Sequence, residues 1–535
     1  MAIGSLTAPY HGDTNPSFAV KLDEGVFICY ACDVRGPFVE LYAKMKNVSK
    51  EEARRIISPP PAFVEALNRE HAVVNWEGKY VILNEERHPI HNWKVITLSS
   101  RADLNLRYQN QTVFRGTKRI CIAEAWLGDP DRREYRGIVF APGEPLQSNY
   151  YNFWQGFAVT PKEGTCDLFL RHIHDNICRK DATLYRYVLS WLAQTVQQPS
   201  RRPGTALVLR GKQGTGKCIF CTLFGSLFGP HFTHATNPDH LTGKFNAHLK
   251  DSVIVFADEA FWAGDKAGEG RLKALITEEW MSVEYKGKDV VRVKNHVRLL
   301  IATNHDWAVP AGFEERRFCV IDVGDAHMQD TAYFEALVNE MNNGGRAAFL
   351  HYLLTFDITK VNLRTLPQTE ALMENKCLSM SAAEEFWHEI LVRGRVFETD
   401  STWTPCINKR NLHNSYVEYA KAIGQRSRRS NETRLGKTIG KLCPHKKDTN
   451  MPERAWDVGD LQRCREAFDR VMNWPNHEWE PPQEPCGVPA DSKPGPGPES
   501  MPAQAGPIKE LSWDQFGPSD NGKEFEKAPQ APQER

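Results

Sequence analysis

The 535-residue chain has no excess of charge of either sign, because 67 Lys and Arg residues balance 67 Asp and Glu residues. No global field therefore draws it toward nucleic acid or a membrane, and such binding must come from local patches. It has no run of roughly 18 or more apolar residues, which argues against a membrane-spanning helix. The first residues, "MAIGSLTAPYHGD", have neither the basic nor the apolar region of a signal peptide. We therefore expect a cytoplasmic protein.

The cysteines give no sign of a disulfide framework. There are 13 of them, an odd number, and they are scattered along a chain that shows no secretion signal. Disulfides are rare in proteins of the reducing cytosol. We interpret most of these cysteines as reduced, buried thiols.

The sequence pattern changes along the chain and predicts five segments. Residues 1–58 are compact and contain a Cys-x-x-Cys motif, and residues 64–160 alternate in short runs typical of strands. Residues 161–375 alternate strand and helix patterns, which is typical of an α/β domain with a largely parallel sheet. Residues 380–475 have helical spacing and a basic character. Residues 479–535 are rich in proline and are predicted to be disordered.

A phosphate-binding loop is predicted where "TALVLRGKQGTGKC" joins an apolar strand pattern to a helical one. Its glycines let backbone N–H groups turn toward phosphates, and Lys217 would reach the β and γ phosphates of ATP. The motif usually ends in Ser or Thr, whose hydroxyl binds Mg²⁺, but this chain has Cys218. The predicted nucleotide-binding residues are Gly211, Lys212, Gln213, Gly214, Thr215, Gly216, Lys217 and Cys218.

An acidic pair ends the next apolar strand pattern, "DSVIVFADEA". We predict that Asp258 orients Mg²⁺ and that Glu259 activates the attacking water. Capping of a helix is the alternative role for such a pair. A further strand pattern, "HVRLLIATN", ends in Asn304, which we interpret as a sensor of the γ phosphate or of the attacking water.

Two arginines precede the last strand pattern of this segment, in "PAGFEERRFCVIDV". Arg316 or Arg317 would stabilise transition-state charge across a subunit boundary, as arginine fingers do. A surface arginine pair is the alternative. A hairpin pattern between the acidic pair and Asn304 is basic, and we expect it to grip a phosphate backbone; the alternative is a solubilising surface. Its predicted DNA-binding residues are Lys286, Lys288, Arg292 and Lys294.

The order of these elements resembles superfamily 3 helicases, and more narrowly the helicase domain of phage and prophage primase-helicases. The resemblance spans most of residues 100–375. It implies an AAA+-like P-loop NTPase core, a homo-hexameric ring with ATP bound between subunits, and movement along single-stranded DNA. Segments that carry it include "YNFWQGFAVTP", "LVLRGKQGTGK", "KFNAHLKDSVIVFADEAFWAGDK", "LKALITEEWMSVEYKGKD" and "ATNHDWAVPAGFEERRF".

The first segment resembles the CHC-type zinc finger of bacterial-type primases. It has His11, a Pro-Ser-Phe motif, Cys29 and Cys32, but Ala8 stands where the first cysteine of that family belongs. Structural zinc normally takes four ligands. A zinc site of His11, Cys29 and Cys32 with a further donor, and a metal-free fold, both stay open. In either case we expect a small sheet that touches single-stranded DNA or the helicase.

The sequence shows no convincing set of acidic residues for primer synthesis. The acidic residues of "GDPDRREY", Asp129 and Asp131, fall in a proline-containing pattern that predicts a loop. Residues 380–475 resemble the winged-helix-type domain that follows phage helicase cores, with a basic helix near 431–442 that would contact duplex phosphates; a solvated basic face is the alternative. Trp513 and Phe516 in the predicted disordered tail are candidates for a motif that binds a replication partner.

We therefore predict an ATP-hydrolysing DNA helicase of the primase-helicase type, with ATP and Mg²⁺ as cofactors and Zn²⁺ as a further candidate. It would be encoded by a phage or prophage, act at the replication fork in the bacterial cytoplasm and not bind membranes. Two alternatives stay open. One is a DNA-binding scaffold with a degenerate ATP site, and the other is a bifunctional primase-helicase that makes primers.

Overall fold

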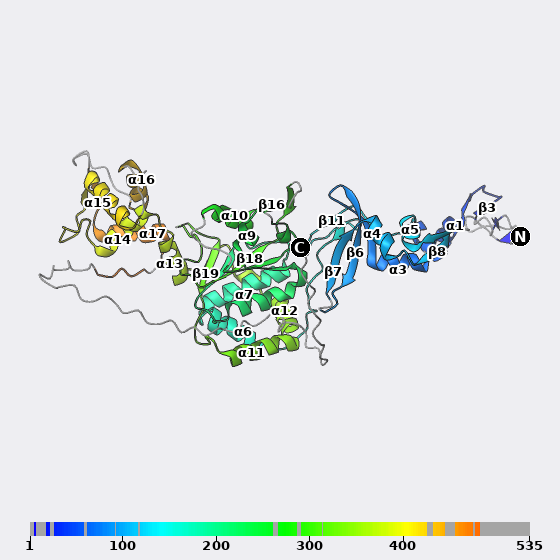
Figure 1. Ribbon diagram of the computed structural model, residues 1–535, viewed down its shortest axis with the longest axis horizontal. Coiled ribbons are helices and arrows are strands. Elements are labelled where there is room, and N and C mark those ends of the chain that lie inside the picture. Colours follow the sequence, from blue (N-terminus) through cyan, green and yellow to red (C-terminus); the bar gives the residue numbers. More distant parts are fainter. Residues whose placement is uncertain are drawn as a thin grey trace, which may run out of the picture. The chain divides into compact units, whose positions relative to one another are not determined.

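The computed structural model divides into two compact units, formed by residues 1–139 with 146–152 and by residues 140–145 with 153–535 (Figure 1). None of the helices in the described part of the chain combines the length and apolar character that crossing a bilayer requires. The described residues are 5–6, 18–21, 26–57, 61–90, 93–115, 118–244, 246–259, 266–285, 290–312, 314–424, 432–443, 455–474 and 477–481.

The first unit begins with a small antiparallel sheet in the order β1-β2-β3-β4. Alternate side chains of β2 and β3 point inward, so that Phe18, Val20, Phe27 and Cys29 pack with Leu41 of the following helix. This period of two is the property of a half-buried sheet. The elements are β1 (Ser5–Leu6), β2 (Phe18–Lys21), β3 (Val26–Cys29), β4 (Arg35–Pro37), α1 (Phe38–Lys46) and α2 (Lys50–Ile57).

A second sheet of this unit has the order β10-β5-β6-β7, in which β5, β6 and β7 follow one another directly as antiparallel strands. Val64 and Trp126 are buried between the sheet and the helices. Asp129 and Asp131 lie in the turn after α5, as the sequence predicts. The elements are α3 (Ala62–Glu70), β5 (His71–Trp76), β6 (Lys79–Arg87), β7 (Lys94–Ser99), α4 (Arg101–Arg107), β8 (Thr112–Arg115), β9 (Lys118–Cys121), α5 (Ile122–Leu127), β10 (Glu134–Tyr135), β11 (Ile138–Val139) and β12 (Tyr151–Asn152).

The second unit is built on a parallel sheet of five strands in the order β14-β15-β18-β13-β19. The three central strands are almost entirely buried, as expected for a parallel sheet with helices on its faces. This confirms the predicted parallel sheet and gives the chain a mixed α/β fold. The strands are β13 (Ala206–Arg210), β14 (Phe232–Ala235), β15 (Ile254–Asp258), β18 (Arg298–Thr303) and β19 (Phe318–Asp322).

Helices cover this sheet, and Figure 1 shows α7 running along α12. A capping Asp181 begins α7, because its side chain accepts hydrogen bonds from the N–H groups of Thr183 and Leu184. The covering helical elements are α6 (Asp167–Arg171), η1 (His172–Ile177), α7 (Ala182–Gln197), α8 (Lys217–Gly225), η2 (Ser226–His231), α9 (Pro238–Thr242), η3 (Ala247–Leu249), α10 (Lys266–Thr277), α11 (Thr331–Glu340), η4 (Met341–Gly345), α12 (Arg346–Thr355) and η5 (Ile358–Lys360).

The strands β16 (Trp280–Val283) and β17 (Val291–Lys294) form an antiparallel hairpin, as the sequence predicts. The predicted tip of this hairpin, with Lys286 and Lys288, lies outside the described residues. The same holds for Trp513 and Phe516 in the C-terminal tail.

A separate hydrophobic core follows, around Trp387, Leu412, Ile439 and Phe468. On α16 the buried residues repeat at helical spacing, while Arg434, Lys437 and Lys441 are exposed. The elements of this part are α13 (Glu370–Leu378), α14 (Ala382–Arg393), β20 (Cys406–Asn408), α15 (Lys409–Ala422), α16 (Glu432–Leu442), β21 (Ala455–Asp457) and α17 (Leu461–Met472).

Candidate nucleotide site

The glycine-rich loop lies between the carboxyl end of β13 and the first turn of α8. Gly211, Gly214 and Gly216 all have positive φ, at 150°, 79° and 87°, a backbone region that favours glycine. At Gly216 a Cβ would also lie 2.6 Å from Phe334 and 2.7 Å from His172. The loop therefore turns its backbone tightly into the N-terminus of a helix, an arrangement that can receive phosphate oxygens.

Lys217 points back into this loop. Its Nζ donates hydrogen bonds to the carbonyl oxygens of Gly211 and Lys212, each at 2.7 Å, and to Asn304 Oδ1 at 2.9 Å. The residue is only 5% exposed, and burial lowers the pKa of its ammonium group. The structure thus brings the predicted phosphate lysine and the predicted sensor together, although they stand 87 positions apart in the sequence.

Cys218 and Asp258 also meet. The Cys218 thiol donates to Asp258 Oδ1 at 3.4 Å and lies 3.5 Å from Oδ2. Desolvation of the thiol by the surrounding chain, with a further contribution from the Asp258 carboxylate, raises the pKa of Cys218 to about 12, although part of the residue stays exposed to solvent. His234 on β14 approaches the same carboxylate, with Nε2 3.4 Å from Asp258 Oδ2.

Glu259 follows Asp258 at the end of β15 and adopts a φ of 52°, which is unusual for a residue with a Cβ. Two contacts to the neighbouring strand hold its carboxylate. Oε1 accepts a hydrogen bond from the Asn304 N–H at 2.9 Å, and Oε2 accepts one from Thr303 Oγ1 at 3.3 Å. A strained residue fixed by its surroundings is typical of functional sites.

The two arginines lie elsewhere. The Ala206 N–H donates to the Arg317 carbonyl at 2.7 Å, and Ala206 pairs with Phe318, so Arg316 and Arg317 precede the amino end of β19. The glycine-rich loop leaves the carboxyl end of β13, and a five-residue strand spans about 16 Å. Arg316 is exposed, and the Arg317 guanidinium lies 3.5 Å from Glu315. Both are thus separated from Lys217 of their own chain.

Two further predicted DNA-binding residues lie on β17. The Arg292 guanidinium lies over the ring of Trp280, 5.1 Å from its centroid, and Lys294 Nζ pairs with Glu144 Oε1 at 2.5 Å. Lys294 is therefore engaged within its own unit, and Arg292 is presented on an exposed aromatic ring.

Sequence reasoning missed the π-helix η1, which packs against the loop. Asn176 Nδ2 donates to the Thr215 carbonyl at 2.7 Å, and the buried His172 ring lies beside Gly216 while its Nδ1 is 3.1 Å from Tyr333 Oη. Burial lowers the pKa of His172 to about 4. The sequence around it shows only helical apolar spacing. Single turns of π-helix are frequent at functional sites, but no local signal in the sequence indicates one.

The predicted zinc ligands are only partly described. Cys29 is buried at the end of β3, Cys32 is exposed in the turn that follows, and the Cys29 N–H donates to the Val34 carbonyl at 2.9 Å. Ala8 and His11 lie outside the described residues. Within the described ranges there is no cluster of three or more His, Cys, Asp or Glu side chains placed to hold a metal. Within the described residues, the predicted zinc site is therefore represented by the two thiols of Cys29 and Cys32.

Two family profiles match the chain. Residues 5–59 match the CHC2 zinc finger, the zinc ribbon of DnaG-type primases, and residues 209–317 match a family of unknown function, DUF5906. The second match covers the glycine-rich loop, the acidic pair, Asn304 and both arginines. Zinc-ribbon ancestry is thus indicated for the first segment.

Curated relatives come from phages. The chain is 29% identical over 192 residues to the DNA primase-polymerase of Nitratiruptor phage NrS-1, covering 35% of this chain and 26% of that protein. It is 46% identical over 48 residues to the Gene 58 protein of Mycobacterium phage D29, covering 9% of this chain and 37% of that protein. The chain therefore spans well under half the length of these relatives.

Among solved structures, the apo C-terminal region of NrS-1 is similar, with a TM-score of 0.55 and 19% identity over 75% of this chain and all of that one. A second crystal form of the same region gives a TM-score of 0.52. At this identity the likeness concerns the fold. The zinc ribbon and the phage primase-polymerase relative show that parts of this chain are similar to phage replication primases.

Proposed function

We propose that the chain is an ATP-hydrolysing motor of the primase-helicase type that acts in phage DNA replication. The observation that carries the proposal is the convergence of Lys217, Asp258, Glu259 and Asn304 at the carboxyl edge of one parallel sheet, next to the glycine-rich loop. Ligands of open α/β sheets bind at this edge. Residues 161–375 would form the motor, as a P-loop NTPase core of the superfamily 3 type.

Each residue has a chemical role in this proposal. The loop N–H groups and Lys217 would bind the triphosphate of ATP, and Asp258 would hold the accompanying divalent cation. Glu259 would act as general base, because its carboxylate is already oriented by Thr303 and Asn304. Asn304 contacts both Lys217 and Glu259. It would sense whether the γ phosphate is present and pass the change to β18, the strand that it follows.

The expected activity is strand separation. Wild-type protein with ATP should separate a forked DNA duplex, whereas the same protein with a nonhydrolysable ATP analogue should not. If ATP were hydrolysed but no fork opened under any condition that supports hydrolysis, the motor would be a translocase or a switch and the helicase proposal would fail.

The position of Arg316 and Arg317 supports an oligomer, the predicted homo-hexamer, in which these arginines reach the nucleotide of a neighbouring copy. We expect an Arg316→Ala/Arg317→Ala double variant and a Lys217→Ala variant each to lose ATP hydrolysis alone. Mixed in equal amounts they should recover part of it, because some interfaces then combine an intact loop with intact arginines. ATP turnover of the mixture measures this. Turnover no higher than the sum of the two separate variants would contradict action across an interface.

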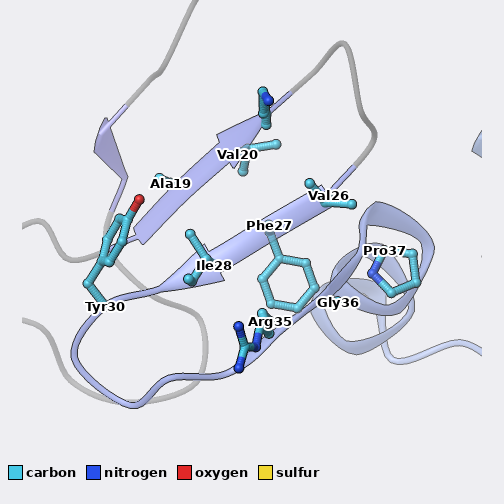
Figure 2. Close-up of a pocket in the computed structure, with 10 residues that line it drawn as sticks. Ala19, Val20, Val26, Phe27, Ile28, Tyr30, Arg35, Gly36 and Pro37 are labelled. Carbon is cyan, nitrogen blue, oxygen red and sulfur yellow. The ribbon is translucent and has the colours of Figure 1, made fainter.

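Single-stranded DNA is the expected partner, and the sheet of the first segment offers it a surface. A groove of 570 Å³ runs over the outer face of β2, β3 and β4, where Ala19, Ile28 and Arg35 are aligned across the strands. Tyr30 stands at its end and is 73% exposed, and Figure 2 shows it with Ile28 and Arg35 along the groove. An aromatic ring with neighbouring cations is the usual platform for stacked bases.

We expect Tyr30→Ala to weaken binding of single-stranded DNA by about 1–3 kcal/mol, because one base loses its stacking partner. Fluorescence anisotropy with a labelled oligonucleotide measures the affinity. Tyr80→Ala is the matched control, since Tyr80 is 77% exposed on the strand β6 of the other sheet. Equal affinities of the two variants would argue that the groove does not bind DNA. The exposed basic residues of α16 and Arg292 are the further proposed DNA contacts.

Primer synthesis is the second candidate function, and the comparisons favour it. A primase zinc ribbon and a primase-polymerase relative are both similar to parts of this chain. Zinc would then be held by Cys29 and Cys32 with donors from the preceding residues, His11 among them. Template-directed incorporation of labelled nucleotides by the purified protein would support this function. No incorporation by a protein that unwinds DNA would exclude it for this chain.

A further inference from the structure

Three side chains from three different elements meet at the proposed nucleotide site. Cys218 lies in the first turn of α8, Asp258 ends β15, and His234 lies on the neighbouring β14. The Cys218 Sγ is 3.4 Å from Asp258 Oδ1, and His234 Nε2 is 3.4 Å from Asp258 Oδ2. The His234 ring is itself fixed, because it stacks on Phe256 at a centroid distance of 4.7 Å and an angle of 4°.

This set of donors does not fit Mg²⁺. Mg²⁺ is a hard cation that demands oxygen ligands in near-ideal octahedral geometry. The position from which a Ser or Thr hydroxyl would serve it carries sulfur, which is a soft donor that selects later first-row and softer cations. The carboxylate of Asp258 accepts hard and borderline cations alike. The mismatch is therefore confined to one atom, the Cys218 Sγ.

We propose that the nucleotide site takes a thiophilic divalent cation in preference to Mg²⁺, with the Cys218 sulfur and the Asp258 carboxylate as its protein ligands. Mn²⁺, Co²⁺ and Cd²⁺ represent the class, in order of increasing affinity for sulfur. This inference rests on the proposed function, because the nucleotide phosphates supply the remaining ligands. Cys218 and His234 both contact Asp258, but no three His, Cys, Asp or Glu side chains of the described residues are placed to hold a metal together, so the cation should bind together with the nucleotide.

The step involves no oxidation. As the bond between the cation and sulfur forms, the thiol proton leaves to solvent. The hydrogen bond from the thiol to Asp258 is then lost, and the thiolate and the Asp258 carboxylate bind the same cation instead. His234 acts as a positioning residue. It faces Asp258 Oδ2, whereas the shorter contact from the Cys218 sulfur is to Oδ1. Such second partners of a metal ligand typically change metal affinity by about 10–100-fold when removed.

The first test measures nucleotide binding and does not require turnover. The affinity for a fluorescent ATP analogue is determined with Mg²⁺, Mn²⁺, Co²⁺ or Cd²⁺ for wild type, Cys218→Ser and Cys406→Ser. We expect wild type to bind the analogue at least roughly tenfold more tightly with Cd²⁺ or Co²⁺ than with Mg²⁺. Cys218→Ser should reverse this order. Cys406→Ser is the matched control, since Cys406 is a partly exposed cysteine on β20 and belongs to none of the proposed sites.

The second test is spectroscopic. A thiolate-to-metal charge-transfer band with Co²⁺ or Cd²⁺ should appear when ATP is added to wild type and to Cys406→Ser, and should be missing in Cys218→Ser. The dependence on ATP separates this site from the other thiols of the chain. His234→Asn should keep the band and weaken cation affinity.

The outcomes separate the two proposals. If wild type and Cys218→Ser bind nucleotide with the same cation preference, the cation proposal is wrong while the nucleotide site stands. If neither protein binds nucleotide with any cation although both are folded by circular dichroism, the proposed function fails and the cation proposal fails with it. A reversed preference together with the ATP-dependent band supports both.

Discussion

Replacing Lys217 by alanine is expected to lower ATP turnover by roughly 10²–10³-fold, the usual effect of removing one preorganised electrostatic group from a reaction site. The Lys217 ammonium is held by two loop carbonyls and by Asn304, so its position is fixed before any phosphate arrives. Little reorganisation is then needed when the γ phosphate binds. Release of inorganic phosphate in the presence of single-stranded DNA measures the effect.

A matched control is Lys360→Ala. Lys360 is an exposed lysine of the same unit and pairs with Asp357 at 3.2 Å. Its replacement by alanine should leave ATP turnover unchanged. Thermal unfolding of both variants should be compared with wild type, because Lys217 also bonds the loop in the absence of ligand. Turnover by Lys217→Ala equal to that of Lys360→Ala would remove Lys217 from the mechanism.

The second large effect is expected at Glu259. Glu259→Gln should lower ATP hydrolysis by about 10²–10⁴-fold, the typical contribution of a positioned general base. Binding of ATP should persist, because the Glu259 carboxylate is hydrogen-bonded to Thr303 and Asn304 on the neighbouring strand and its end, and not to the glycine-rich loop. The glutamine keeps the size of the side chain and one acceptor oxygen for the Asn304 N–H. Parallel measurements of ATP affinity and of single-turnover hydrolysis separate these two properties.

Glu335→Gln, at an exposed position on α11, controls for the loss of one negative charge. A Glu259→Gln variant that hydrolyses ATP at the wild-type rate would assign the base to another residue. A variant that loses both binding and hydrolysis would give Glu259 a structural role in the loop instead.

The sequence predicted the parallel sheet of the second unit, because each strand is a short apolar run bounded by polar or glycine-rich residues. Such local patterns indicate secondary structure without knowledge of distant contacts. The sequence also indicated that Lys217, Asp258 and Asn304 follow such strands, and the carboxyl ends of adjacent parallel strands share one edge. Their meeting in the structure follows from this topology.

Other features depend on contacts between distant residues, which a single sequence does not display. The π-helix at 172–177 is bonded to the loop through Asn176 and Thr215, and His234 reaches Asp258 from the neighbouring strand β14. The position of Arg317 at the amino edge of the sheet depends on the pairing of β19 with β13. In each case the decisive partner lies on another element of the fold.

The central proposal is ATP hydrolysis coupled to DNA at the site of Lys217, and one measurement tests it most directly. ATP turnover is measured for wild type and Lys217→Ala, with and without single-stranded DNA, using Mg²⁺ and Mn²⁺ in parallel. Wild type should turn over ATP, with stimulation by single-stranded DNA, and Lys217→Ala should lack this turnover under every condition. Equal turnover by the two proteins, or none by either with both cations, would contradict it.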